Sequence, residues 1–125
     1  MTDPAHGAGR LDDAAELLTR FIDDSLELRD GALFDPAGRQ LFATDGNDWT
    51  AGVSRIWDAA ETDGRDVAYV HVGTAAGEVL AVRGPAGSAV VLSERFPLAS
   101  LVLSDLRAVL RELERAGASA ATGSG

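Results

Sequence analysis

Cysteine and lysine are both absent from this sequence of 125 residues. Without cysteine the fold cannot depend on disulfides, and this fits a reducing compartment, so we expect a cytoplasmic protein. Without lysine the chain cannot form a phosphate-binding Walker loop, because that motif requires one. All eleven basic residues are therefore arginines, and they are scattered singly from Arg10 to Arg115.

Long apolar runs and basic clusters are missing as well. No apolar run approaches the roughly 18 residues that a membrane-spanning helix needs. The first ten residues have no apolar stretch after a basic start, so we expect no secretory signal. The net charge of −9 opposes binding to nucleic acid and to anionic membrane surfaces, because both attract clustered arginine and lysine.

A hydrophobic fraction of 46% is too high for a disordered chain and is enough for one packed core. We therefore expect a single domain over residues 10–116. The flanking segments 1–9 and 117–125 lack hydrophobic periodicity, and the second is rich in Gly, Ala and Ser. Both are predicted to be disordered tails.

Helical spacing of apolar residues predicts three helices. The first starts at residue 11 and ends near residues 24–27, the second is capped by Asn47 or Asp48 and stops at Gly64, and the third starts at residue 97 and ends at Gly117. Short apolar segments between turn residues predict five strands, at 31–34, 39–44, 67–72, 77–82 and 88–92. Asp35, Pro36 and Gly38 occupy the first, second and fourth positions of a type I turn, so the first two strands should form a hairpin. Strands that are joined by short turns must be antiparallel.

Several of the predicted strands are apolar at consecutive positions, for example Val79-Leu80-Ala81-Val82. A sheet with one wet face would alternate, so helices should cover both faces. The sequence thus predicts an α/β (α+β) domain built from an antiparallel sheet and three helices.

The element order resembles the roadblock/dynein-light-chain family. The resemblance is carried by Gly-Ala-Leu-Phe-Asp-Pro-Ala-Gly at 31–38, and by the paired strands 77–82 and 88–92 before a long closing helix. It covers residues 10–116. It implies a roadblock/profilin-like sheet in the order 2-1-5-4-3, with the middle helix on one face and the two terminal helices on the other.

The same resemblance implies a homodimer, in which the third strands pair edge to edge and the middle helices lie side by side. Bacterial members of the family are partners of Ras-like small GTPases, as in the Mgl type, and others sit in operons with sensor kinases. It follows that the expected partners are a second copy of the chain and a Ras-like GTPase or signalling protein, with no nucleic acid and no membrane.

Residues that could carry chemistry are sparse. His6 lies in a predicted tail and His71 inside a strand, and neither has a partner at metal-ligand spacing. Ser54 lies within a predicted helix and lacks the second glycine of a nucleophile elbow. We therefore expect no catalytic residues, no metal and no cofactor, and predict a non-enzymatic protein.

Predicted interface residues lie on the third strand and the middle helix. Val67, Tyr69 and His71 share one strand face, which we expect to lie under the middle helix near a dimer seam. Trp57 should face the sheet and contribute to the same interface. Trp49 and Arg55 are the predicted partner contacts, because Trp and Arg concentrate binding energy at protein interfaces.

The leading hypothesis is therefore a homodimeric scaffold or regulator that binds a Ras-like GTPase or a signalling complex. The alternative is a small-molecule sensor domain of PAS-like or profilin-like shape, which would need a cavity with converging polar groups. An enzyme is the third possibility.

Overall fold

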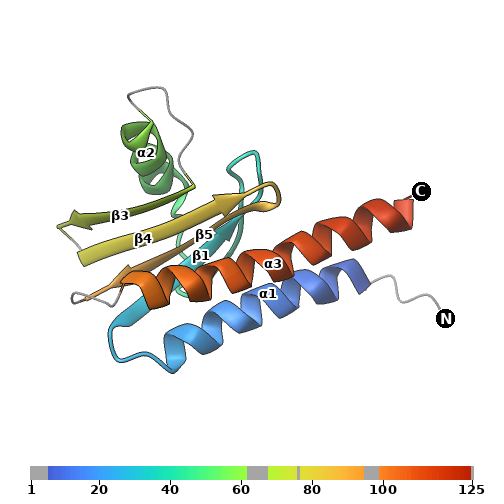
Figure 1. The fold of residues 1–125 in the computed structure, drawn as a ribbon, viewed down its shortest axis with the longest axis horizontal. Coiled ribbons are helices and arrows are strands. Elements are labelled where there is room, and N and C mark those ends of the chain that lie inside the picture. Colours follow the sequence, from blue (N-terminus) through green and yellow to red (C-terminus); the bar gives the residue numbers. More distant parts are fainter. Residues whose placement is uncertain (1–5, 62–67, 76, 95–98, 125) are drawn as a thin grey trace.

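The computed structural model describes residues 6–61, 68–75, 77–94 and 99–124, with side chains described for 11–61, 68–75, 77–94 and 99–115. Its elements run in the predicted order of helix, two strands, helix, three strands and helix (Figure 1). They are α1 (His6–Asp23), β1 (Leu28–Phe34), β2 (Gln40–Ala43), α2 (Thr50–Ala60), β3 (Tyr69–Thr74), β4 (Gly77–Gly84), β5 (Gly87–Ser93) and α3 (Ala99–Ser124).

The strands form one sheet in the order β2-β1-β5-β4-β3, and all neighbouring strands are antiparallel. Helices α1 and α3 lie side by side on one face of this sheet, and α2 lies alone on the other (Figure 1). The predicted strand order and the predicted division of the helices between the faces are both confirmed.

Alternation along β4 and β5 produces two hydrophobic cores, because successive side chains of a strand point to opposite faces. Leu80 and Val82 of β4 are buried with α1 and α3. Val79 and Ala81, the intervening residues of β4, are buried with Val53 and Trp57 of α2. The consecutive apolar residues of the sequence therefore reflect a sheet that is covered on both sides.

The two terminal helices are longer than the hydrophobic pattern predicts. Helix α1 begins at His6, and α3 continues to Ser124, past the predicted end at Gly117. The predicted domain bounds at residues 10 and 116 thus fall inside helices, and the division into one domain with two tails stays a prediction. An isolated glycine does not end a helix by itself, and the residues after Gly117 include several alanines, the strongest helix formers.

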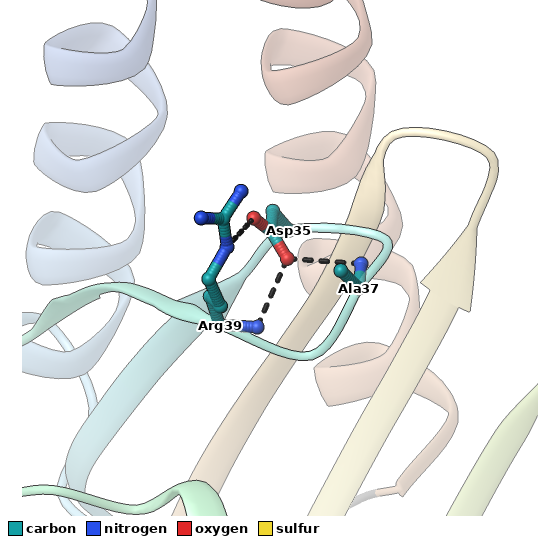
Figure 2. A network of polar contacts seen from close by, with 3 residues as sticks. All are labelled: Asp35, Ala37 and Arg39. Carbon is teal, nitrogen blue, oxygen red and sulfur yellow. Dashed lines mark hydrogen bonds and ion pairs between the residues drawn. The ribbon is translucent and has the colours of Figure 1, made fainter.

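A tight turn joins β1 to β2 as predicted from Asp35, Pro36 and Gly38. One Asp35 carboxylate oxygen accepts hydrogen bonds from the backbone N–H groups of Ala37 and Arg39, both at 2.9 Å, and the other accepts one from Arg39 Nε at 3.1 Å (Figure 2). Gly38 has a φ of 86°, a conformation that glycine adopts without strain. These bonds, led by the one from the Arg39 backbone, hold the pKa of Asp35 below its usual value of 3.8.

The Asp35 carboxylate should make the stability of the protein depend on pH in the acid range. Because its pKa is lower in the folded chain, ionised Asp35 stabilises the fold above pH 3.8, and this contribution is lost as the pH falls further. An Asp35→Asn variant keeps an acceptor for the two backbone N–H groups but loses the charge. We expect its urea midpoint to lie below that of wild type at pH 6 and the two midpoints to converge below pH 3.8.

The matched control is Asp58→Asn, a charge-neutralising change at an exposed position of α2. Its urea midpoint should lie close to that of wild type at pH 6. A gap between Asp35→Asn and wild type that stays constant down to pH 2 would show that the carboxylate charge does not stabilise the turn.

Candidate functional site

Strand β3 is an edge strand of the described sheet, with β4 as its one neighbour. The Arg83 backbone N–H donates to the Ala68 carbonyl at 2.8 Å, and the register then pairs Val70 with Ala81 and Val72 with Val79. Hydrogen-bonded and non-hydrogen-bonded pairs alternate in an antiparallel ladder. The backbone groups of Tyr69, His71 and Gly73 therefore point away from β4, toward the open edge.

The side chains of β3 face the opposite way from our prediction. Val70 and Val72 pack in the core beneath α2, whereas Tyr69 and His71 lie on the face that α3 covers. The Arg107 guanidinium of α3 lies 5.8 Å from the Tyr69 ring centroid. The prediction that Tyr69 and His71 lie under the middle helix is wrong, because both sheet faces are covered and the apolar valines take the α2 side.

His71 of the edge strand β3 and Glu78 of its neighbour β4 pair across the two strands, with 3.1 Å between His71 Nε2 and Glu78 Oε1. Tyr69 is half exposed. Both predicted interface residues thus lie on the open edge strand. Val67, the third strand residue predicted for the interface, lies outside the described residues. The interface itself stays a prediction.

A shallow apolar groove of about 370 Å³ runs between α2 and β3. The described residues that line it, here called the α2–β3 groove, are Arg55, Ile56, Ala59, Ala60, Val72, Gly73 and Thr74. Arg55 is exposed, and no ion pair joins it to any other described residue. The predicted contact residue Arg55 is therefore available to a partner from this groove.

The two tryptophans of the middle helix have different environments. Trp57 is only 9% exposed and packs against the sheet, as predicted, with the Arg83 guanidinium 4.3 Å from its ring centroid. Arg83 also pairs with Glu61 at the end of α2. Trp49 is half-buried against the same core, so it is less exposed than a purely outward contact residue would be.

A second hollow, of about 460 Å³, lies at the start of α2. Its described lining residues define the acidic recess: an exposed rim of Asp45, Asn47, Asp48 and Gly52, the half-buried Trp49, and a floor of Val53, Ile56, Thr74, Val79, Val90 and Leu92. The acidic recess and the α2–β3 groove share Ile56 and Thr74, so they adjoin along one side of α2.

Side-chain bonds hold the rim of the acidic recess in place. Gln40 of β2 accepts from the Trp49 backbone N–H at 2.8 Å and donates to the Asn47 carbonyl at 2.7 Å. The Trp49 indole N–H donates to Asp45 at 2.9 Å, and the Asn47 backbone N–H donates to the same carboxylate oxygen. The loop between β2 and α2 therefore presents a fixed set of polar groups.

Both rim carboxylates are held in the ionised form by neutral donors. The bond from the Trp49 indole, with those from Asn47, lowers the pKa of Asp45 below its usual value. Hydrogen bonds from Thr50 likewise lower the pKa of Asp48. No arginine or histidine is among the described lining residues, so within the described part of the chain no basic side chain of the lining neutralises either charge.

The acidic recess is not predicted by the sequence pattern. From the sequence, Asn47 and Asp48 are candidates for the cap of the middle helix, whereas Trp49 occupies the N-cap position without a side-chain capping bond. The signal in the sequence was the run Asp45-Gly46-Asn47-Asp48-Trp49, which has more carboxylates than one cap requires. The floor residues come from four separate elements, and local sequence could not bring them together.

Gly52 opens the acidic recess at the expense of helix stability. It lies near the start of α2, and a Cβ atom added there would have no neighbour within 4 Å. Neither packing nor an unusual φ requires glycine at this position. We expect Gly52→Ala to raise the free energy of unfolding by about 0.5–1 kcal/mol in urea denaturation, because alanine is the better helix former.

Gly38→Ala is a matched control, since a Cβ atom there would also meet nothing within 4 Å. Its positive φ makes the expected change opposite in sign, a loss of about 1 kcal/mol. A loss of stability in Gly52→Ala would mean that the glycine has a structural role.

No group of three or more His, Cys, Asp or Glu side chains that could hold a metal ion occurs among the residues described. Within those same ranges, no helix has the length and hydropathy needed to cross a bilayer.

No protein-family model and no curated protein matches the sequence. Solved structures do match the fold. A Roadblock/LC7 domain from Streptomyces avermitilis has a TM-score of 0.60 at 15% identity, over 78% of this chain and 94% of that one. A second structure of such a domain from the same organism has a TM-score of 0.58 at 15% identity, over 80% and 93% of the two chains. A structure of MglB with a tetrameric arrangement has a TM-score of 0.61 at 17% identity, over 86% and 92%. The fold of the chain is therefore the roadblock/LC7 fold, as the sequence resemblance implied.

Proposed function

We propose that this roadblock fold is a non-enzymatic scaffold, which forms a homodimer and regulates a Ras-like small GTPase or a signalling complex in the cytoplasm. The observation that carries the proposal is the open edge of β3 beside an apolar groove. Three residues of β3 direct their backbone groups toward this edge. An uncovered edge strand is a template for pairing with another chain.

A second copy of the chain suits this edge. Strand β3 (Tyr69–Thr74) contains no proline, lysine or acidic residue, which are common features that prevent edge-to-edge pairing. An antiparallel pair of identical strands satisfies the open backbone groups of both copies and extends the sheet. The α2–β3 groove beside the edge gives the partner copy an apolar surface to cover. The tetrameric arrangement of the MglB neighbour supports self-association of this fold.

The proposed partner surface is α2. Arg55 is exposed on it, and arginine is frequent among the residues that dominate binding energy. Trp49 is the second proposed contact, through the part of its ring that remains exposed at the acidic recess. The Ras-like GTPase as partner comes from the sequence resemblance to bacterial roadblock proteins, and the fold is consistent with it.

Capture from the cytosol of the source organism, followed by mass spectrometry, tests the proposed partner. The immobilised chain should retain a small GTPase or a signalling protein. Arg55→Ala should retain about tenfold less of it, as expected when an interface arginine is truncated. Arg111→Ala removes an exposed arginine from α3, on the other side of the sheet, and should capture as wild type does.

Equal capture by both variants would place the docking face away from the exposed side of α2. Retention of metabolic enzymes alone, with no GTPase and no signalling protein, would contradict the proposed function.

A further inference from the structure

We propose that the acidic recess binds a cationic side chain of a partner protein, an arginine or lysine with an aliphatic neighbour. This inference rests on the proposed scaffold function for the existence of a protein partner, but it does not require the homodimer. It concerns the recess at the start of α2 and does not depend on the edge of β3.

The charge of the rim selects a cation. Asp45 and Asp48 carry two negative charges, and every hydrogen bond to their carboxylates described above comes from a neutral donor. Arg55, the basic residue of the adjoining groove, does not line the recess. A cationic group entering the recess would therefore gain two negatively charged carboxylates as partners.

The Trp49 ring is a second feature of the recess that attracts a cationic group. Its indole N–H is bonded to Asp45, and this bond fixes the ring at the wall of the recess. The face of an aromatic ring attracts a guanidinium or ammonium group, and tryptophan does so most strongly. Charge and ring thus favour the same kind of group.

The floor of the recess favours a ligand whose cationic group is attached to an aliphatic chain. Val53, Ile56, Val79, Val90 and Leu92 are all hydrocarbon side chains. Arginine and lysine have an aliphatic stem below the charged head, so the stem and a neighbouring aliphatic side chain can cover this floor.

The open form of the recess favours a protein side chain over a free small molecule. Asp45, Asn47, Asp48 and Gly52 are all exposed, so the hollow opens to solvent along its rim. Small-molecule pockets usually enclose most of the ligand surface. An open recess covers only one side of its ligand, as happens when a side chain projects from another protein.

Nuclear magnetic resonance of the two indole N–H signals tests this directly. The probe is the peptide acetyl-Leu-Arg-Leu-amide, titrated to millimolar concentration into the full-length protein. The Trp49 signal, assigned by its loss in Trp49→Phe, should shift saturably, while the Trp57 signal from the buried core should not move. The charge-reversed peptide acetyl-Leu-Glu-Leu-amide should produce no saturable shift.

The variants locate the binding determinants. The double variant Asp45→Asn/Asp48→Asn keeps carbonyl acceptors for the rim hydrogen bonds and should bind the arginine peptide roughly fivefold more weakly. Asp58→Asn, on the exposed side of α2, should bind as wild type does. Gly52→Leu places a side chain at the mouth of the recess, where a Cβ atom meets nothing, and should abolish the shift without unfolding the protein.

Equal binding of the glutamate peptide, or unchanged affinity in the double variant, would overturn the proposal. So would hexylamine binding as tightly as the peptide, because the recess would then be a small-molecule site. The titration is read on the chain itself, whatever its oligomeric state. Its failure is therefore distinct from failure of the homodimer or of GTPase capture.

Discussion

His71→Pro should convert the protein from a dimer to a monomer without unfolding it. Light scattering on a size-exclusion peak should give about twice the chain mass of 13.0 kDa for wild type at tens of micromolar, and about 13.0 kDa for the variant. The reason is the position of one backbone N–H. The register with β4 directs the His71 N–H toward the open edge, so proline removes a donor from the proposed seam and leaves the β3–β4 ladder intact.

Val72→Pro is the matched control one residue along the same strand. The Val72 N–H points toward Val79 of β4, so proline there removes a bond within the sheet and should lower the melting temperature markedly. If His71→Pro is folded and still dimeric, β3 is not the seam. A wild-type protein that is monomeric at tens of micromolar would contradict the homodimer itself.

Much of the fold could be predicted because short local patterns of residues indicate it. Asp35, Pro36 and Gly38 each suit one position of a tight turn, and the structure has that turn with the side-chain bonds such residues make. The run Val79-Leu80-Ala81-Val82 indicates a sheet covered on both faces, and its members are shared between two cores. These signals are short in sequence and depend on no distant residue.

The errors concern properties that local patterns do not determine. Alternation along β3 separates Val70 and Val72 from Tyr69 and His71, but it does not say which set faces α2. That choice depends on β4 and β5, whose register places Val79 and Val90 beneath α2. Helix ends are also weakly determined, as the continuation of α3 past Gly117 illustrates.

The acidic recess could not be predicted for a similar reason. Its rim is nearly continuous in sequence, from Asp45 to Gly52, so the polar character of the rim can be recognised from the sequence alone. Its floor combines residues of α2, β3, β4 and β5, which meet only when the sheet is assembled. A hollow that combines this polar rim with this apolar floor is therefore a feature of the tertiary structure.

Trp57→Ala should cost about 3–5 kcal/mol of the free energy of unfolding. Val53 and Trp57 are the only buried side chains of α2, so Trp57 provides most of the surface that holds this helix on the sheet. The Arg83 guanidinium, which lies over the ring, would lose that contact as well. Urea denaturation followed by far-ultraviolet circular dichroism measures the loss, at one fixed protein concentration because the stability of the proposed dimer would depend on concentration.

Trp49→Ala is the natural comparison, since it removes the same side chain from the same helix. Trp49 is only half-buried, so the expected loss is about 1–2 kcal/mol, from its packing and from its bond to Asp45. A loss below about 1 kcal/mol in Trp57→Ala would show that α2 does not depend on this side chain for its position. Helix α2 positions the acidic recess, the α2–β3 groove and Arg55 together. Loss of Trp57 should therefore impair peptide binding, self-association and partner capture at once, whereas Arg55→Ala should leave peptide binding intact, because Arg55 lines the α2–β3 groove and not the acidic recess.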